Sequence, residues 1–190
     1  NLTMNDVLVH SDNTGMVYIS RKLGLDRMIK YIDLFGFGRA TNIDLQGEVT
    51  PSLRPRDSWY PIDLATSSFG QGISVTPIEL LSAFGALANK GIRMQPHVVA
   101  SVETADGKTL PIPPKIINKP ITEKTAKIVT EILVNAVNNG EAKFAKTKGY
   151  RFAGKTGTAQ IPVAGHYDPT NTIASFIGYA PAEDPKFVML

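Results

Sequence analysis

The sequence predicts an α+β fold in which helices pack on an antiparallel sheet. Apolar residues recur at helical spacing in residues 77–88 and 123–137. Three segments with strand composition then follow one another, at 151–161, 173–180 and 186–190. Strands that follow one another with short connections usually pair as antiparallel neighbours, so these three predict one sheet.

The composition is that of an ordinary folded domain. An apolar content of 43% and a charged content of 19% over 190 residues exclude a disordered chain and allow a sizeable core. The net charge of +3 is small and the lysines are scattered, so no nucleic-acid partner is expected. No window is apolar and long enough to cross a bilayer, and no signal peptide is recognisable.

No metal or other cofactor is expected. The chain has no cysteine, which excludes disulfides and thiolate metal sites, and its three histidines share no metal-ligand spacing. His10 is expected to cap a helix or lie on the surface, and His97 to be structural. His166-Tyr167-Asp168 is expected in a loop near the mouth of the site, where a substrate contact is one interpretation.

The first elements are two short helices. Residues 13–23 carry apolar side chains at near-helical spacing, and Gly24 stops the pattern. Asp26 is expected to cap a second helix at 28–35, which ends at Gly36.

A long irregular stretch precedes the third helix. Residues 39–75 are rich in glycine, proline, serine and aspartate, which predicts irregular structure with one short strand at 42–45. Pro77 at the first helical position and Glu79 in the first turn then predict the start of the helix at 77–88.

A hairpin and a fourth helix come next. Strand patterns at 98–103 and 109–112 flank Ala105-Asp106-Gly107, a hairpin signal. Thr122 opens the helix at 123–137. The chain therefore divides into a helical part, about 1–140, and a sheet part, about 150–190, within one domain that covers 1–190.

The most informative segment is Lys155-Thr156-Gly157-Thr158-Ala159-Gln160, on the first of the three strands. A peptide that ends in a carboxylate needs a cation and hydrogen-bond donors, which Lys155 and the hydroxyls of Thr156 and Thr158 offer. Alternation along the strand places those hydroxyls on one face. Gly157 leaves room for substrate along the strand edge, and the N–H of Thr158 is a candidate oxyanion donor. The alternative is a threonine-rich strand with a solvated lysine.

A second motif, Ser11-Asp12-Asn13, precedes the first helix. The serine hydroxyl can relay a proton to a leaving amine, and the amide of Asn13 can hold a substrate amide. Asp12 is expected to bond nearby backbone. The alternative is a plain helix cap, because serine and aspartate are common in that position.

Together the two motifs resemble two of the three signatures of serine acyl-transfer enzymes that react with β-lactams. The chain resembles the transpeptidase domain of class B penicillin-binding proteins, which gives the fold a β-lactamase/transpeptidase-like topology. The residues that carry the resemblance extend over nearly the whole chain: Ser11 to Gly15, Phe69 to Pro77, Ala88 to Gly91, Gly154 to Gln160 and Phe176 to Pro181.

The resemblance implies a peptidoglycan D,D-transpeptidase that binds D-Ala-D-Ala stem peptides and β-lactams, on the outer face of a bacterial membrane to which an N-terminal helix anchors the parent protein. It implies that Lys155, Thr156 and Thr158 bind the substrate carboxylate, that Ser11 and Asn13 complete the catalytic cleft, and that Gln160 touches substrate. The stretch from Phe69 to Gly72 is expected to be a buried loop that shapes the fold.

The family's third motif, Ser-x-x-Lys, which carries the nucleophile, does not occur at any serine of the chain. We therefore expect an incomplete domain, truncated at both ends and inactive alone, whose open face is covered by a companion fragment, a missing half-domain or a dimer partner. Two alternatives stay open. One is a non-catalytic penicillin-sensing or scaffold domain. The other is a D,D-carboxypeptidase or β-lactamase-like hydrolase, for which Glu48 is the candidate carboxylate although no matching pattern surrounds it.

Overall fold

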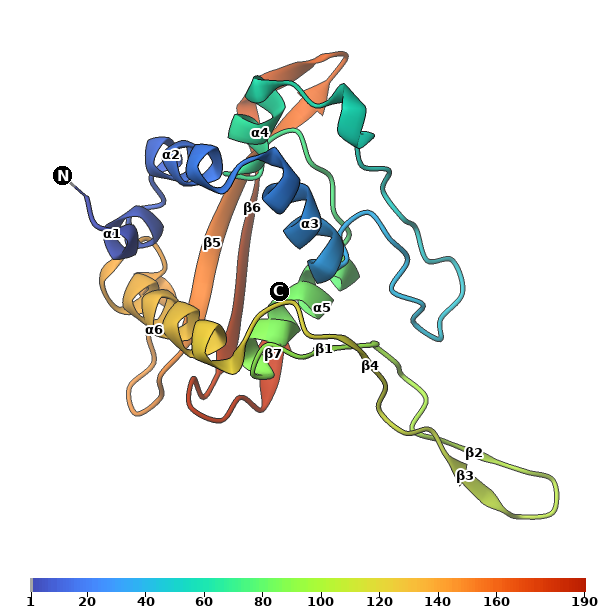
Figure 1. Cartoon of the computed structure of the whole chain (residues 1–190). Helices are drawn as coiled ribbons and strands as arrows, with labels where there is room; N and C mark the ends of the chain where they lie inside the picture. The colour runs from blue at the N-terminus through green and yellow to red at the C-terminus, as the bar shows by residue number, and fades with distance from the viewer. Residues whose placement is uncertain (1) are drawn as a thin grey trace.

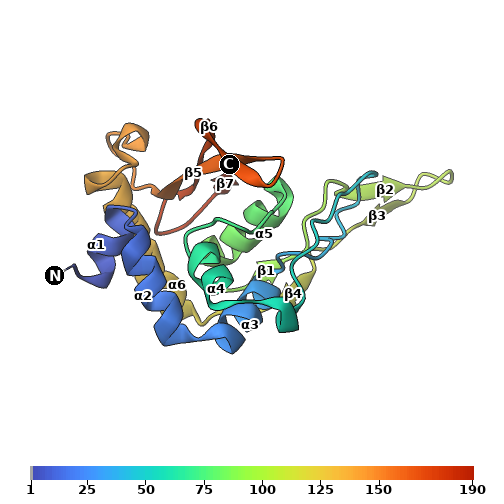
Figure 2. The same cartoon turned by 90° about the horizontal axis from the view of Figure 1, so that it is seen from above.

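In a computed structural model, which describes residues 2–190, helices pack on one side of an antiparallel sheet. Figure 1 shows the long strands β5 and β6 running behind α6 and α5, and Figure 2 shows these helices on one side of the sheet. The α-helices are α1 Met4–Val9, α2 Asn13–Leu23, α3 Leu25–Phe35, α4 Pro61–Ser67, α5 Pro77–Ala88 and α6 Glu123–Asn139. The strands are β1 Arg93–Met94, β2 Ser101–Glu103, β3 Thr109–Pro111, β4 Ile116–Asn118, β5 Ala153–Val163, β6 His166–Ala180 and β7 Phe187–Met189. The 3₁₀ helices are η1 Arg56–Ser58 and η2 Lys143–Ala145.

The main sheet has the strand order β5-β6-β7, with both pairs antiparallel. The α+β prediction and the three C-terminal strands are therefore confirmed. Two smaller ribbons pair β1 with β4 and β2 with β3, and the second projects from the body as an arm (Figure 1). None of the helices among residues 2–190 is both long and apolar enough to cross a membrane.

The core lies where α5 and α6 meet the sheet. It contains Leu133, Val134, Ala153, Tyr179 and Ala182, with Phe84 among the side chains packed against it. The ring of Tyr179 is fully buried and meets that of Phe84 edge to face at 5.7 Å. Burial raises the pKa of the Tyr179 hydroxyl, which is bonded to Thr130 Oγ1 at 2.6 Å. The hydrogen bond between Tyr179 and Thr130 joins β6 to α6 and holds the sheet against this helix.

Replacing Tyr179 by phenylalanine should lower the melting temperature by roughly 2–4 °C, because one buried hydrogen bond, worth about 1 kcal/mol, is lost. Thr130 keeps its bond to the carbonyl oxygen of Ala126 at 2.8 Å, so no donor is left unpaired. Thermal unfolding measures the change. The control is Tyr150→Phe at an exposed ring, and equal melting temperatures for both variants would contradict this account of the core.

The buried Glu79 ties the start of α5 to an upstream loop. Its carboxylate accepts hydrogen bonds from Thr76 N at 2.6 Å and from Gly38 N at 2.8 Å. Thr76 Oγ1 in turn accepts from Glu79 N, which completes a capping box. The predicted start of this helix at Pro77 is confirmed, and so is the helix that follows Thr122.

Several expectations for the N-terminal half are wrong. Helix α3 begins at Leu25 after Gly24, so Asp26 lies inside the first turn and pairs with Arg56 instead of capping the helix. The expected strand at 42–45 does not form. There the backbone is held by Glu48, whose carboxylate accepts hydrogen bonds from Thr41 N, Thr41 Oγ1 and Asn42 N.

Two helices were not predicted. Helix α1 begins with a capping box between Thr3 and Asp6, a signal that the sequence carries three residues apart. Helix α4 lies within the stretch predicted as irregular, and starts with Pro61 at its first position and a carboxylate at Asp63.

The hairpin of β5 and β6 differs from the prediction at its turn, because β5 ends at Val163 instead of residue 161 and β6 begins at His166 instead of residue 173. Ala164 and Gly165, both with positive φ, form a two-residue turn, and Pro162 pairs with Tyr167 across it. Residues 166–168 therefore lie at the start of β6 and not in a loop.

Candidate active site

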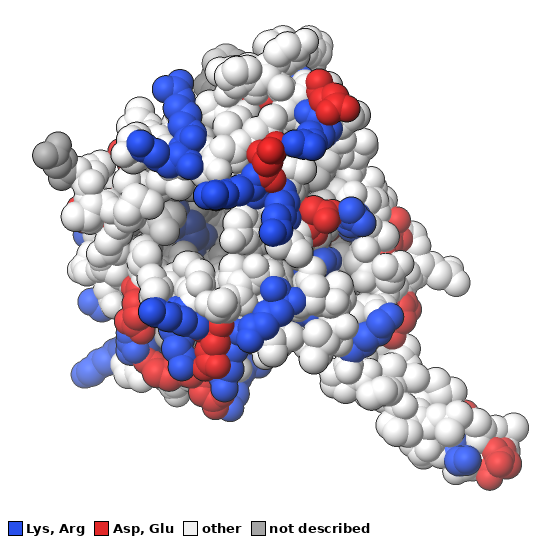
Figure 3. All heavy atoms as spheres, in the orientation of Figure 1, with Lys and Arg blue, Asp and Glu red and all other residues white. Residues whose placement is uncertain are grey.

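A cleft of about 680 Å³ lies between the α1–α2 corner, the end of α4, the end of α6 and strand β5. Figure 3 shows this face of the molecule hollowed between α2 and α6. Basic side chains gather over α2 and α3, whereas acidic and basic side chains alternate over α6 (Figure 3). The seven residues that the sequence predicts as a site all line this cleft: Ser11, Asn13, Lys155, Thr156, Gly157, Thr158 and Gln160.

The two sequence motifs meet at one contact. Lys155 Nζ donates a hydrogen bond to Ser11 Oγ at 2.9 Å, although the residues lie 144 positions apart. Lys155 Nζ also lies 3.1 Å from the carbonyl oxygen and 3.3 Å from Oγ1 of Thr156. The ammonium thus joins the α1–α2 corner to strand β5 and orients the serine hydroxyl.

Ser11 occupies a sharp corner between α1 and α2. Its φ is +52°, a left-handed conformation that costs a non-glycine residue about 1 kcal/mol. The corner is held by Asp12 N, which donates to Val7 O at 2.9 Å. Gly15 lets the helices approach closely, because a Cβ there would lie 2.5 Å from a methyl group of Val7. The glycine after the serine motif therefore has a packing reason that places Ser11 at the cleft.

Asp12 has the structural role that the sequence predicts. Its Oδ1 accepts hydrogen bonds from Thr14 N at 2.9 Å and Thr14 Oγ1 at 2.7 Å, which caps α2. These bonds lower the pKa of the Asp12 carboxyl. Asn13 is the first residue of α2 and is exposed to the cleft. His10 is the exposed residue that ends α1, as the sequence predicts.

Lys155 is half-buried, and this burial lowers the pKa of its ammonium. The nearby carboxylate of Glu141 opposes the shift. A desolvated cation interacts more strongly with an anion than a solvated one, because the local dielectric is lower. The position is therefore suited to binding a carboxylate.

Strand β5 offers the cleft a free edge within the described residues 2–190, because it pairs with β6 alone. Thr158 lies opposite Ala174 in this pairing. A Cβ on Gly157 would lie 2.7 Å from Ser175 Oγ, so this glycine has a packing reason on the β6 side besides the open cleft that the sequence suggests. An extended peptide can lie along such an edge as a further strand.

Sequence reasoning missed part of the cleft lining. The stretch from Phe69 to Gly72 was expected to be a buried loop, but Phe69 and Gln71 are partly exposed and line the cleft. Tyr167 also lines it, from β6, and Glu141 does so from the end of α6. These residues reach the cleft through tertiary packing, which no local sequence pattern reveals for Tyr167 or Glu141. Only the Phe-Gly-Gln-Gly pattern at 69–72 could have indicated Phe69 and Gln71.

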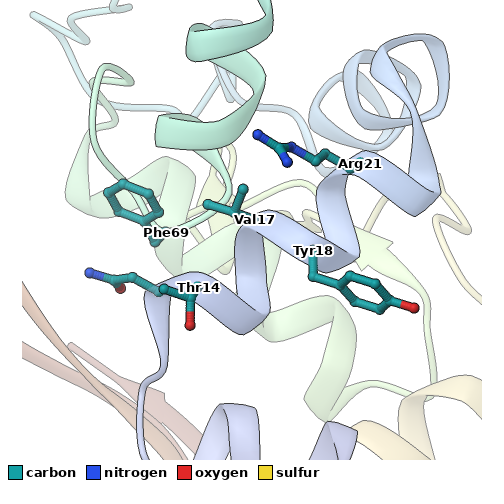
Figure 4. Close-up of a pocket in the computed structure, with 6 residues that line it drawn as sticks. Thr14, Val17, Tyr18, Arg21 and Phe69 are labelled. Carbon is teal, nitrogen blue, oxygen red and sulfur yellow. The ribbon is translucent and has the colours of Figure 1, made fainter.

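A shallower pocket of about 390 Å³ adjoins the cleft and shares Asn13 and Phe69 with it. Figure 4 shows Val17 facing Phe69 across this pocket, while Tyr18 points away from Phe69. Arg21 lines the same pocket one turn further along α2.

The described part of the chain holds no group of three or more histidine, cysteine, aspartate or glutamate side chains positioned to bind a metal. Glu48, the candidate hydrolytic carboxylate, is occupied by three hydrogen bonds in the loop at Thr41 and Asn42 and does not line the cleft. These bonds lower its pKa, with the Thr41 hydroxyl as the main cause.

Comparison with known proteins agrees with this geometry. The family model described as the penicillin binding protein transpeptidase domain matches residues 1–190. Stage V sporulation protein D of Bacillus subtilis is 41% identical over 98% of this chain and 29% of its own length. The peptidoglycan D,D-transpeptidase FtsI of Buchnera aphidicola is 30% identical over 100% of this chain and 32% of its own. The chain thus spans less than a third of the length of these relatives.

The fold is shared with a solved member of the family. The crystal structure of penicillin binding protein 3 from Mycobacterium tuberculosis, complexed with aztreonam, matches with a TM-score of 0.92 and 31% identity. The match covers 98% of this chain and 44% of that one. The resemblance to class B penicillin-binding proteins is confirmed: the chain belongs to the penicillin-binding protein transpeptidase domain family.

Proposed function

We propose that the protein containing these residues is a serine D,D-transpeptidase that cross-links peptidoglycan stem peptides and is acylated by β-lactams. The contact between Ser11 Oγ and Lys155 Nζ at 2.9 Å carries this proposal, because it assembles both motifs in one cleft. The names of the relatives support it: FtsI is a peptidoglycan D,D-transpeptidase, and the similar crystal structure contains the β-lactam aztreonam.

In this proposal each residue has a separate role in one acyl-transfer reaction. Lys155 and the hydroxyls of Thr156 and Thr158 bind the carboxylate of a D-Ala-D-Ala stem peptide. Thr158 N–H stabilises the oxyanion of the tetrahedral intermediate. Ser11 relays the nucleophile's proton to the leaving amine.

The remaining residues position the substrate. Asn13 holds its amide from the start of α2. Gly157 and Gln160, further along the edge of β5, accommodate the peptide backbone. All three line the same cleft as Ser11 and Lys155.

The attacking serine belongs to a part of the protein outside these residues, since no Ser-x-x-Lys occurs among them. We propose that residues 1–190 form part of one domain, and that the rest of the domain covers apolar side chains now exposed at the free edge of β7, including Phe187 and Met189. A dimer partner or a companion fragment is the alternative cover. One relative is named a peptidoglycan D,D-transpeptidase, so we propose that the protein acts at the outer face of the bacterial membrane, anchored by a segment outside this sequence.

The alternatives are a non-catalytic penicillin-sensing or scaffold domain and a D,D-carboxypeptidase. Incubation of the full-length protein with fluorescent penicillin and with a D-Ala-D-Ala stem peptide separates these functions. A transpeptidase forms the adduct and joins stem peptides to an amine acceptor. A sensor forms the adduct without cross-linking, and a D,D-carboxypeptidase releases D-alanine and transfers the remaining acyl peptide to water.

Ser11→Ala in the full-length protein should lower the rate of stem-peptide cross-linking about 10²-fold, because a positioned proton relay contributes at least this much. The Lys155 ammonium loses one acceptor, but the carboxylate site remains, so non-covalent binding of the peptide should persist. Ser74→Ala, at an exposed serine outside the cleft, is the matched control. Equal rates for both variants would remove Ser11 from the mechanism.

A further inference from the structure

Two opposite charges line the cleft. Among the described residues that form it, Lys155 supplies the positive charge and Glu141 the negative one. The proposed mechanism uses Lys155 for a carboxylate and gives Glu141 no task. A carboxylate in a substrate cleft attracts cationic groups on the ligand and repels anionic ones.

Glu141 is held in place by its neighbours. A Cβ on Gly140, at the end of α6, would lie 2.2 Å from the carbonyl oxygen of Val9, so the backbone there packs tightly against α1. Ala142, on the other side, is 1% exposed. The side chain of Glu141 itself is exposed. The backbone on both sides of Glu141 is therefore tightly packed, while the Glu141 carboxylate faces solvent at the wall of the cleft.

The carboxylate of Glu141 is available to a ligand. Ion pairs within the described residues occupy other glutamates, such as Glu131 and Glu183 with Arg151, but none involves Glu141. Burial lowers the pKa of Lys155, and Glu141 lies near enough to oppose part of this shift, although no ion pair within 4.0 Å joins them across the part of the chain described. The two charges therefore stand apart in the cleft and face the same space.

We propose that Glu141 is a specificity-determining residue that selects ligands carrying an ammonium group in addition to the carboxylate held at Lys155. The cleft then recognises a zwitterion: the carboxylate at the β5 edge and the ammonium toward the end of α6. This inference rests on the proposed function of the cleft as a binding site for carboxylate-terminated peptides and β-lactams.

The test uses two penicillins that differ by one α-amino group, ampicillin with the amine and benzylpenicillin without it. In the full-length protein, Glu141→Gln should lower the ratio of the acylation rate constants, ampicillin over benzylpenicillin, about threefold, because exposed ion pairs are weak. The ratio in the unaltered protein should fall as salt is added and approach that of the variant. Glu103→Gln, at an exposed carboxylate on the β2–β3 arm, is the matched control and should leave the ratio unchanged.

The ratio separates recognition from a general electrostatic effect. If Glu141 acts only through the charge of Lys155, the variant slows both penicillins equally and the ratio stays constant, which would overturn the proposal. Equilibrium binding of the same two ligands by calorimetry gives the ratio without acylation. If neither penicillin acylates the unaltered protein, the proposed function fails, and the binding ratio still decides the role of Glu141.

Discussion

Full-length protein with Lys155→Met should be acylated by fluorescent penicillin about 10²- to 10³-fold more slowly than the unaltered protein, a loss of the size seen when a charge-stabilising donor is removed. The variant removes the hydrogen bond to Ser11 Oγ and the cation proposed to bind the carboxylate. Methionine has a similar length and suits a half-buried position, so the fold should persist. The rate of adduct formation over a range of penicillin concentrations measures the loss.

Two controls sharpen this result. Lys186→Met removes an exposed lysine near the other edge of the sheet, paired with Asp184, and should leave acylation unchanged. Circular dichroism checks that both variants fold. Acylation of Lys155→Met at the unaltered rate would show that the ammonium is not part of the binding site.

The pH dependence follows from the same residue. Burial lowers the pKa of Lys155, so its ammonium loses the proton at a lower pH than a solvated lysine does. In the proposed mechanism only the charged form binds the carboxylate, so acylation should decline as the pH rises through this lowered pKa. The Lys155→Met variant should not show this decline in acylation rate at high pH. If the variant still shows it, another group causes the decline.

The polypeptide of residues 1–190 alone should show no stoichiometric mass gain after incubation with penicillin, whereas the full-length protein should gain one penicillin. The physical reason is that the cleft holds the residues proposed to bind the carboxylate and to relay the proton, whereas residues 1–190 contain no serine with lysine three residues later. Intact-mass measurement makes the comparison. Circular dichroism shows whether the isolated polypeptide folds, and a stoichiometric adduct on it would contradict the prediction.

The sequence indicated residues that the fold brings into one cleft, although it missed several elements of the fold around them. Lys155 and Ser11 could be recognised because their motifs are local and chemically specific, and the structure joins them. Helix α5 was predictable from Pro77 and Glu79, since capping signals act within one turn. The extension of β6 to His166 was missed because the positive-φ turn at Ala164 is not typical of alanine.

The missed parts depend on contacts between distant segments. Glu141 lines the cleft because α6 ends against α1, which no local pattern reveals. The failed strand at 42–45 has a similar cause: the Glu48 carboxylate accepts hydrogen bonds from Thr41 N and Asn42 N, which compete with strand pairing. Asp26 was a plausible cap, but Gly24, with φ of +82°, takes the cap position, and the helix starts at Leu25 instead of at residue 28.

The most direct test is to locate the penicillin on the full-length protein. After labelling, proteolysis and mass spectrometry of the peptides identify the acylated residue. The account predicts an adduct on a serine outside residues 1–190, followed three residues later by lysine, with a yield that falls in Lys155→Met. An adduct on Ser11, or on any other serine within residues 1–190, would contradict it.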